Sequence, residues 1–261
     1  MKYLDQLNRV LQLNEPPKRI VSLVPSQTEL LVDLGLEKQI VGVTKFCVHP
    51  SSLRKTKTIV GGTKQINIKK IKSLQPDIIL CNKEENTKEM IKELESVAPI
   101  HISDVNTIED CLELIKIYGE IFDKHNAASR WIDAIKTERE DFLSLLTLTK
   151  QIKVAYFIWK TPWMVVASQT FINTMINEAG FKNVFEEEKR YPEIELDHPK
   201  LKEADCIFLS SEPYPFKEKD IEEFKKHYQR KKVVIVDGEM FSWYGSRMCK
   251  SYQYFKNQFI E

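Results

Sequence analysis

Two side chains with chemical reactivity lie close together at Cys47 and His49, where only Val48 separates them. On an extended segment, residues i and i+2 point to the same face, so the thiol and the imidazole can meet. A cysteine nucleophile also needs an oxyanion hole and a third group that orients its base, and no motif predicts either one. We therefore keep a thiol/imidazole enzyme acting on a cofactor-like substrate as an alternative, and we expect no catalytic residues.

His49 has a second role open to it. Neutral imidazole is the commonest metal ligand among protein side chains. One histidine and one cysteine do not make a metal site, but His49 can serve as an axial ligand to a metal that arrives inside a bound ligand. The simpler interpretation is a histidine that hydrogen-bonds a polar edge of the ligand.

The motifs of common enzyme families are absent. The sequence contains no GxxxxGK[ST], GxGxxG, HExxH or GxSxG pattern. The run GGTK, from Gly61 to Lys64, lacks the spacing of a phosphate-binding loop, and a tight turn that lets the backbone approach a ligand explains it better. The five cysteines form no CxxC pair, which excludes a zinc ribbon and a dithiol motif and suits structural thiols. We expect a protein that is not an enzyme and has no intrinsic cofactor.

Short apolar strands alternate with helices along the chain. Residues 19–25 are a run of β-formers, and Ser26 to Glu29 read as the capping box of a helix that ends at Gly35. We predict further strands at 40–46, 76–80, 100–102, 153–159, 164–167, 206–209 and 233–236, and helices at 67–74, 85–97, 171–179 and 247–260. This alternation predicts an α/β protein with mainly parallel sheets covered on both faces.

One long helical stretch divides the chain. Residues 123–148 contain neither Gly nor Pro and carry apolar residues at roughly helical spacing. We predict an N-terminal α/β lobe at 1–122, a linking backbone helix at 123–149 and a C-terminal α/β lobe at 150–261.

The loops after the predicted strands are rich in aromatic side chains. Ligands of parallel α/β proteins gather at the carboxyl ends of the strands, and three of the four tryptophans lie in these loops. Loop aromatics beside a few polar groups suit a large, flat, partly apolar ligand. The predicted ligand-binding residues are Pro25, Ser26, Gln27, Phe46, Cys47, His49, Gly62, Thr63, Lys64, Glu84, Glu85, Trp159, Trp163, Glu212, Tyr214, Phe241, Trp243, Tyr244 and Arg247.

Charge and hydropathy exclude some partners. Lys and Arg number 39 against 38 Asp and Glu among 261 residues, so no overall field attracts nucleic acid or an anionic membrane. No stretch reaches the roughly 18 apolar residues of a membrane span. Residues 1–17 lack the apolar core of a signal peptide, so as written the chain is expected in the cytoplasm. A periplasmic or cell-surface location is the alternative if a leader has been removed.

Several motifs together resemble one family. RIVSLVPSQTEL at 19–30, IVGVTK at 40–45 and SLQPDII at 73–79 are similar to the opening of periplasmic B12 and iron-siderophore substrate-binding proteins, the helical-backbone metal receptors. FCVHP at 46–50, GGTK at 61–64, NKEEN at 82–86, SEPYPF at 211–216 and SWYGSR at 242–247 resemble the cobalamin-binding subgroup. The resemblance implies a class III fold, with two α/β lobes joined by a backbone helix, and a ligand held without chemistry in a cleft between the lobes.

The resemblance also implies a ligand and partners. The expected function is binding of cobalamin (vitamin B12) by a monomer, as in the substrate-binding components of ABC importers. When the sequence is compared without gaps with the B12 binders, the aromatic positions of their cleft correspond to Phe46, His49 and Phe241. One position that is tryptophan in the B12 binders corresponds to Thr63. A ferric siderophore or haem is the alternative ligand, since lysines and an arginine in or beside the loops could bind an anionic chelate: Lys45, Lys64, Lys83, Lys160 and Arg247.

Docking to a permease is implied at two positions. The family presents one carboxylate from each lobe to arginines of the ABC permease, and these positions fall on Lys69 and Asp197. Lys69 reverses one charge, which would turn attraction into repulsion. A cytoplasmic corrinoid binder, carrier or sensor therefore stays open beside an import component.

Overall fold

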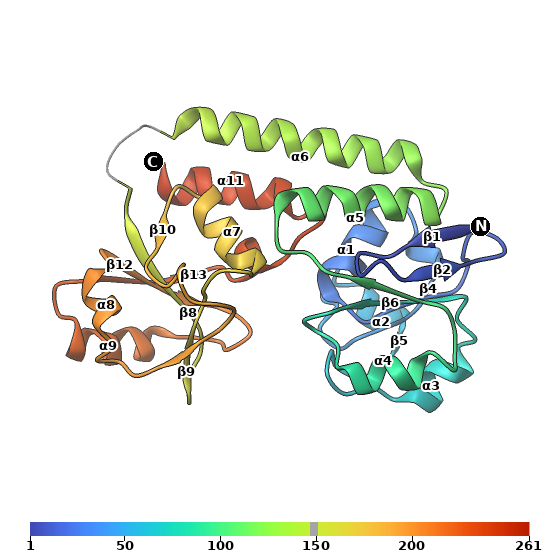
Figure 1. Cartoon of the computed structure of the whole chain (residues 1–261), viewed down its shortest axis with the longest axis horizontal. Coiled ribbons are helices and arrows are strands. Elements are labelled where there is room, and N and C mark those ends of the chain that lie inside the picture. Colours follow the sequence, from blue (N-terminus) through green and yellow to red (C-terminus); the bar gives the residue numbers. More distant parts are fainter. Residues whose placement is uncertain (147–150, 261) are drawn as a thin grey trace. The chain divides into compact units, whose positions relative to one another are not determined.

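The computed structural model describes residues 1–146 and 151–260. The chain divides into two compact units. Unit 1 comprises residues 1–105, 109–136 and 244–247, and the described part of unit 2 comprises residues 106–108, 137–146, 151–243 and 248–260. Figure 1 shows an α/β arrangement in each, which confirms the predicted fold class.

Unit 1 is built on a five-stranded parallel sheet with the order β5-β4-β3-β6-β7. Its strands are β3 (Ile20–Ser22), β4 (Ile40–Val43), β5 (Thr58–Ile59), β6 (Ile78–Asn82) and β7 (Ile100–Ser103). Its helical elements are α1 (Pro25–Asp33), η1 (Glu37–Gln39), α2 (Leu53–Thr56), α3 (Ile68–Ser73), α4 (Lys88–Leu94) and most of α5 (Ile108–Ile121). Both faces are buried because helices flank a parallel sheet, and apolar strand residues pack against Ile71 of α3 and Leu94 of α4.

The first helix begins two residues earlier than its sequence pattern predicts. Pro25 is the first residue of α1, and the N-cap is Val24, which has no side chain that can cap. The predicted capping box from Ser26 to Glu29 is therefore wrong. Proline suits the first helical position because its φ is fixed near the helical value. The Glu29 carboxylate binds Arg247 instead of capping the helix. The predicted end is confirmed, since Gly35 follows with φ of +79°.

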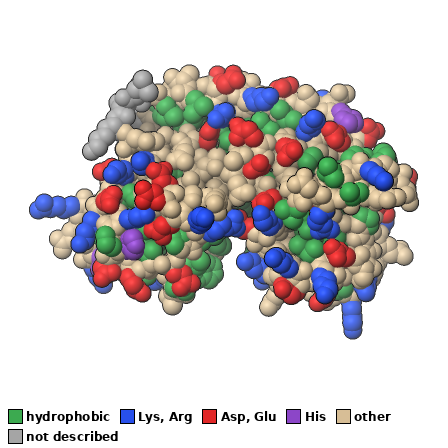
Figure 2. Space-filling model, viewed as in Figure 1, with side chains coloured by type: hydrophobic (Ala, Val, Ile, Leu, Met, Phe, Trp, Pro, Cys, Tyr) green, Lys and Arg blue, Asp and Glu red, His purple; other side chains and the backbone are tan. Residues whose placement is uncertain are grey.

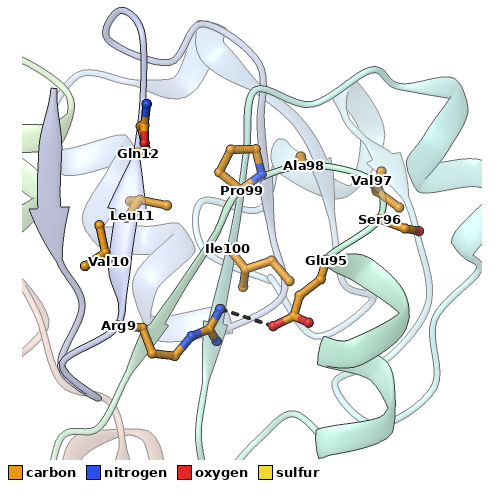
Figure 3. A pocket seen from close by; sticks show the side chains of 10 residues that line it. All are labelled: Arg9, Val10, Leu11, Gln12, Glu95, Ser96, Val97, Ala98, Pro99 and Ile100. Atoms are coloured by element: carbon orange, nitrogen blue, oxygen red, sulfur yellow. Dashed lines mark hydrogen bonds and ion pairs between the residues drawn. The ribbon is translucent and has the colours of Figure 1, made fainter.

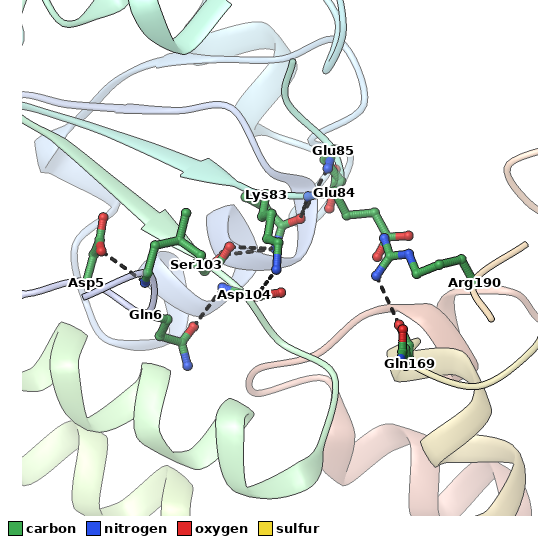
Figure 4. Close-up of polar contacts among 11 residues, drawn as sticks. Asp5, Gln6, Lys83, Glu84, Glu85, Ser103, Asp104, Gln169 and Arg190 are labelled. Atoms are coloured by element: carbon green, nitrogen blue, oxygen red, sulfur yellow. Dashed lines mark hydrogen bonds and ion pairs between the residues drawn. The ribbon is translucent and has the colours of Figure 1, made fainter. Parts of the chain in front are cut away.

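An N-terminal hairpin, which the sequence does not predict, protects the edge of this sheet. Strands β1 (Lys2–Leu4) and β2 (Val10–Gln12) pair antiparallel. Between them, Asp5 Oδ2 accepts a hydrogen bond from the backbone N–H of Ile102 (3.3 Å), and Gln6 Oε1 accepts one from that of Asp104 (3.2 Å; Figure 4). These side chains supply acceptors that a neighbouring strand would otherwise give to the edge strand β7.

Unit 2 contains a mixed sheet with the order β11-β9-β8-β12-β13, and β10 also pairs with β8. The strands are β8 (Lys153–Trp159), β9 (Trp163–Val165), β10 (Lys182–Asn183), β11 (Glu193–Ile194), β12 (Cys206–Ser210) and β13 (Lys232–Val236). The β8–β12–β13 part is parallel, whereas β9 runs antiparallel to β8 because only three residues connect them. The helices include α7 (Phe171–Glu178), α8 (Pro199–Glu203), α9 (Glu218–His227), α10 (Glu239–Ser242) and α11 (Met248–Phe259).

A single helix contributes to both units. Helix α6 (His125–Leu145) has 21 residues, with His125–Lys136 in unit 1 and Thr137–Leu145 in unit 2. It lies within the stretch predicted as a linking helix, of which residues 147–149 fall outside the described residues. The predicted lobe boundaries themselves stay a prediction.

Candidate functional site

Five buried polar side chains form a hydrogen-bonded network at the carboxyl ends of β6 and β7 in unit 1. Gln27 Nε2 donates to Ser103 Oγ (2.5 Å) and to Tyr244 OH (2.9 Å). Tyr118 OH donates to Gln27 Oε1 (2.5 Å), and Asn82 Nδ2 donates to Ser103 Oγ (3.0 Å) and Tyr244 OH (3.1 Å). The sequence predicts Gln27 and Tyr244 as site residues, and the structure brings them together. Asn82 was predicted only as the first residue of the NKEEN loop, and Ser103 and Tyr118 were missed, although a polar residue at the end of an apolar strand is a usable signal for Ser103.

The segment Tyr244–Arg247 is fixed within unit 1 by further polar contacts. Arg247 forms a bidentate ion pair with Glu29, with Nε to Oε2 at 2.6 Å and Nη2 to Oε1 at 2.9 Å. Ser246 Oγ donates to Asp33 Oδ2 (2.5 Å). Arg247 is only 4% exposed and its guanidinium is paired with the Glu29 carboxylate, so this ion pair holds the segment in place within unit 1.

The thiol of Cys47 is buried. Its Sγ lies 3.1 Å from Thr28 Oγ1 and 3.3 Å from Thr44 Oγ1, and the residue is fully buried. Burial raises the pKa of the Cys47 thiol above its usual range, against the opposing effect of the threonine hydrogen bonds. A thiolate nucleophile needs the opposite environment, so the geometry does not favour the thiol/imidazole enzyme. His49 is half-buried, and within residues 1–146 and 151–260 no group of three or more His, Cys, Asp or Glu could hold a metal ion.

Two loops of unit 1 meet around an exposed aromatic ring. Phe46 is 47% exposed, and Lys45 Nζ lies 5.0 Å from the centre of its ring. A Cβ at Gly62 would come within 3.3 Å of the Phe46 ring, so glycine lets the two loops approach. Asn86 Nδ2 donates to the carbonyl of Thr63 (2.8 Å), which joins the loop after β6 to the same group.

Two predicted carboxylates lie on the loop after β6. The backbone N–H groups of Glu84 and Glu85 donate to Asn82 Oδ1 at 2.8 and 3.1 Å, and both residues are half-buried. The same asparagine therefore belongs to the buried network and shapes this loop. Lys64, on the neighbouring loop, is exposed, whereas Pro25 and Ser26 are buried in the first turn of α1.

In unit 2 an exposed and a half-buried aromatic ring pack together at the end of β8. Trp159 is 39% exposed, and its ring meets that of Tyr214 edge to face at 5.8 Å between centroids. The backbone N–H of Tyr214 donates to the carbonyl of Ile158, so the loop after β12 is attached to β8 at this point. The two rings therefore lie together at the carboxyl end of β8.

Two other predicted aromatics of unit 2 lie in its core or pack against it. Trp163 is half-buried, stacks on Phe216 with 6.2 Å between ring centroids and packs against a buried apolar cluster of the unit. Phe241 is fully buried, with the rings of Tyr156 and Phe255 at 5.2 and 4.9 Å. In this arrangement Phe241 can touch a ligand only if neighbouring rings move, because these rings cover it.

Glu212, in the loop after β12, is hydrogen-bonded to Trp243, which follows α10. Glu212 Oε1 accepts hydrogen bonds from Ser242 Oγ (2.7 Å) and Trp243 Nε1 (2.8 Å), and the Trp243 residue is 7% exposed. Burial raises the pKa of the Glu212 carboxyl, the Ser242 hydrogen bond opposes this, and the carboxylates of Glu239 and Asp237 add to it. Glu212 is therefore a partly desolvated carboxylate among other negative charges.

Several cations beside these loops are already paired. Lys160 Nζ lies 2.8 Å from Asp220 Oδ1 and 2.5 Å from Glu223 Oε2, and Lys83 Nζ lies 2.5 Å from Asp104 Oδ2 (Figure 4). Figure 2 shows Lys and Arg side chains interspersed with Asp and Glu on the face of each unit in view. The loops therefore do not present a strongly cationic surface.

A separate pocket of about 400 Å³ lies in unit 1, beside β2 and the start of β7 (Figure 3). Arg9 and Glu95 pair across it at 3.4 Å. None of the predicted ligand-binding residues lines this pocket, so it is distinct from the loops described above.

Comparison with known proteins identifies the family. A family model described as "Periplasmic binding protein" matches residues 20–232, most of the chain. The chain belongs to the periplasmic binding protein family. This membership agrees with the resemblance carried by the sequence motifs.

The names of similar proteins mention different ligands. YvrC, an uncharacterised ABC transporter substrate-binding lipoprotein of Bacillus subtilis, is 27% identical over 187 residues, which are 69% of this chain and 59% of YvrC. The chain thus matches less than two thirds of that relative. A vitamin B12-binding protein of Vibrio parahaemolyticus is 24% identical over 199 residues, 76% of this chain and 72% of the relative. The structure of a periplasmic haem-binding protein from Pseudomonas aeruginosa superposes with a TM-score of 0.79 at 18% identity and covers 92% of both chains, which shows the class III fold.

The names of the family and of the similar proteins give information on where such proteins are located. Its relatives are named as periplasmic proteins or as a lipoprotein, so they give no support to the cytoplasmic location expected from the sequence. Among the helices that the structure describes, none is long and apolar enough to cross a membrane.

Proposed function

We propose that this protein is the substrate-binding component of an ABC importer and that its ligand is cobalamin, bound without catalysis. The observation that carries the proposal is the exposure of aromatic rings at the carboxyl ends of strands: Phe46 in unit 1 and Trp159 in unit 2, where Trp159 packs on the half-buried ring of Tyr214. Apolar side chains of this size are normally buried, and exposed rings beside polar loops suit a large, flat ligand. The name of the Vibrio parahaemolyticus relative supports the choice of cobalamin.

The charges near the loops favour a ligand without a large negative charge. Of the five cations that could bind an anionic chelate, Lys83, Lys160 and Arg247 are ion-paired to carboxylates of their own unit. An anion would have to break these pairs to use them. Haem or a ferric siderophore is the second candidate, which the likeness to a haem-binding protein favours, and Lys45 and Lys64 would be its cationic contacts.

Import requires a membrane permease outside this chain. Lys69 and Asp197, the positions that the resemblance assigns to docking, are both exposed, on α3 and before α8. Because Lys69 is positive, we propose that a cognate permease presents a carboxylate opposite it. The names of the relatives support a location outside the cytoplasm.

Calorimetric titration with cyanocobalamin tests the function. The wild-type protein should bind it with micromolar or tighter affinity. Phe46→Ala and Trp159→Ala should each weaken binding by roughly 1–3 kcal/mol if their rings stack on the corrin. Tyr3→Ala, which removes an aromatic ring from β1, is the matched control and should bind as the wild type does.

The cobalt absorption spectrum tests the role of His49. A spectrum that shifts on binding in the wild type and not in His49→Ala would make this histidine an axial ligand. Absence of both heat and spectral change in the wild type would refute cobalamin as the ligand, and the same titration with haemin would then test the second candidate.

A further inference from the structure

The side chain of Glu212 is held at one oxygen and open at the other. Oε1 accepts hydrogen bonds from Ser242 Oγ at 2.7 Å and Trp243 Nε1 at 2.8 Å. Oε2 accepts no hydrogen bond from the part of the chain that the structure describes, and it is not among its fully buried polar atoms. The carboxylate therefore has a fixed orientation and one oxygen that can accept a further hydrogen bond.

The position of Glu212 depends on a close backbone contact. A Cβ at Gly238 would lie 2.7 Å from Glu212 Cγ, a separation that real Cβ atoms essentially never show. The backbone N–H of Gly238 also donates to Ser211 Oγ at 2.9 Å. The loops after β12 and β13 thus pack together only because residue 238 is glycine, and this packing places Glu212 at the carboxyl ends of both strands.

The charges around Glu212 in its own unit are mainly negative. Asp237 and Glu239 act on it as like charges, and no ion pair to Glu212 occurs among the described residues of unit 2. Lys160 is already paired with Asp220 and Glu223. An ionised carboxylate can only accept hydrogen bonds, so a ligand group at Oε2 has to be a donor, and a second carboxylate there would be repelled.

We propose that Glu212 is a specificity-determining residue, which accepts an N–H from a neutral amide group of the ligand and rejects ligands that bring a carboxylate to the same position. The inference rests on the proposed function and refines it. Cobalamin carries primary amides around its corrin ring, whereas haem carries carboxylates at the edge of its macrocycle. Glu212 would therefore distinguish the two ligand classes that the relatives' names suggest.

A pair of ligands that differ by one group tests this role. Cyanocobalamin and its monocarboxylic acid derivatives, in which one peripheral amide is hydrolysed, are titrated at pH 8 into the wild-type protein and Glu212→Gln. For the derivative hydrolysed at the amide that Glu212 contacts, wild-type affinity should fall roughly 10- to 100-fold below that for cyanocobalamin, the scale of a hydrogen bond to a charged group. The side-chain amide of the Glu212→Gln variant can still accept from Ser242 and Trp243 through its carbonyl oxygen, and its NH₂ group can donate to a carboxylate. The difference should therefore shrink to about threefold or less in this variant.

Glu193→Gln is the matched control, since it removes the same charge at an exposed position of β11. It should keep the wild-type preference. If the wild type binds cyanocobalamin and every derivative equally, or if Glu212→Gln keeps the preference, the role of Glu212 is refuted while the proposed function stands. A wild type that binds none of these ligands would refute the proposed function as well.

Discussion

His101 on β7 is a fully buried imidazole with no hydrogen bond to either ring nitrogen within the described residues. Its ring packs edge to face against Tyr118 at 5.3 Å. Burial, together with the positive charge of Arg9, lowers the pKa of His101 to about 3. The unfolded value is about 6.5, so folding favours the neutral imidazole, and this contribution to stability is complete above about pH 6.5 and declines as the pH falls toward 3.

We predict that this histidine makes the protein sensitive to acid. Between pH 7.5 and pH 5.0, the free energy of unfolding should fall by about 2 kcal/mol more in the wild type than in His101→Phe, which has nothing to protonate there. Urea denaturation at the two pH values measures this difference. Equal losses in the two proteins would mean that His101 is not buried as a neutral group.

The bidentate pair of Arg247 and Glu29 predicts a large effect of a single substitution. Arg247→Ala removes the guanidinium that is ion-paired with the buried Glu29 carboxylate and should lower the free energy of unfolding by roughly 3–5 kcal/mol in urea denaturation. Adding Glu29→Gln to that variant removes the carboxylate charge and should recover part of the loss. A double variant that is no more stable than Arg247→Ala would contradict this explanation.

At the scale of elements, strong local patterns were predicted and context-dependent features were not. The strand at 153–159 and the helix beginning at Phe171 agree with the structure, because apolar runs and a stop at Gly180 define them locally. The β1–β2 hairpin was missed because strands of three residues give no readable alternation. The sequence predicts Trp163, Phe241 and Trp159 alike as ligand-binding residues. Only the packing of other elements decides that Phe241 is covered, that Trp163 is partly covered and that Trp159 is exposed.

This difference in burial predicts opposite effects of two substitutions. Phe241→Ala removes a ring from the core of unit 2 and should lower the free energy of unfolding by about 3–5 kcal/mol. Trp159→Ala removes a ring that is 39% exposed and should change stability by less than about 1 kcal/mol while weakening ligand binding. Urea denaturation of both variants measures the effect on stability, and calorimetric titration measures the effect on binding. Equal losses of stability in the two variants would contradict the prediction.

At the scale of the whole molecule, the charges are nearly balanced. The formal net charge is +1, and Figure 2 shows both signs mixed on the face in view. If the ligand is cobalamin and the loop cations stay paired within their units, affinity should change less than about twofold between 0.05 and 0.5 M NaCl. An anionic chelate bound by Lys45 and Lys64 should weaken clearly over this range, because salt screens attraction between exposed charges. Titration at both salt concentrations measures the difference.

The crystal structure of the protein with cyanocobalamin tests the central claim most directly. We predict that the corrin ring lies against Phe46 or Trp159 and that a peripheral amide lies within hydrogen-bond distance of Glu212. Corrin bound instead in the pocket beside Arg9 and Glu95, or no bound corrin at saturating ligand, would contradict it.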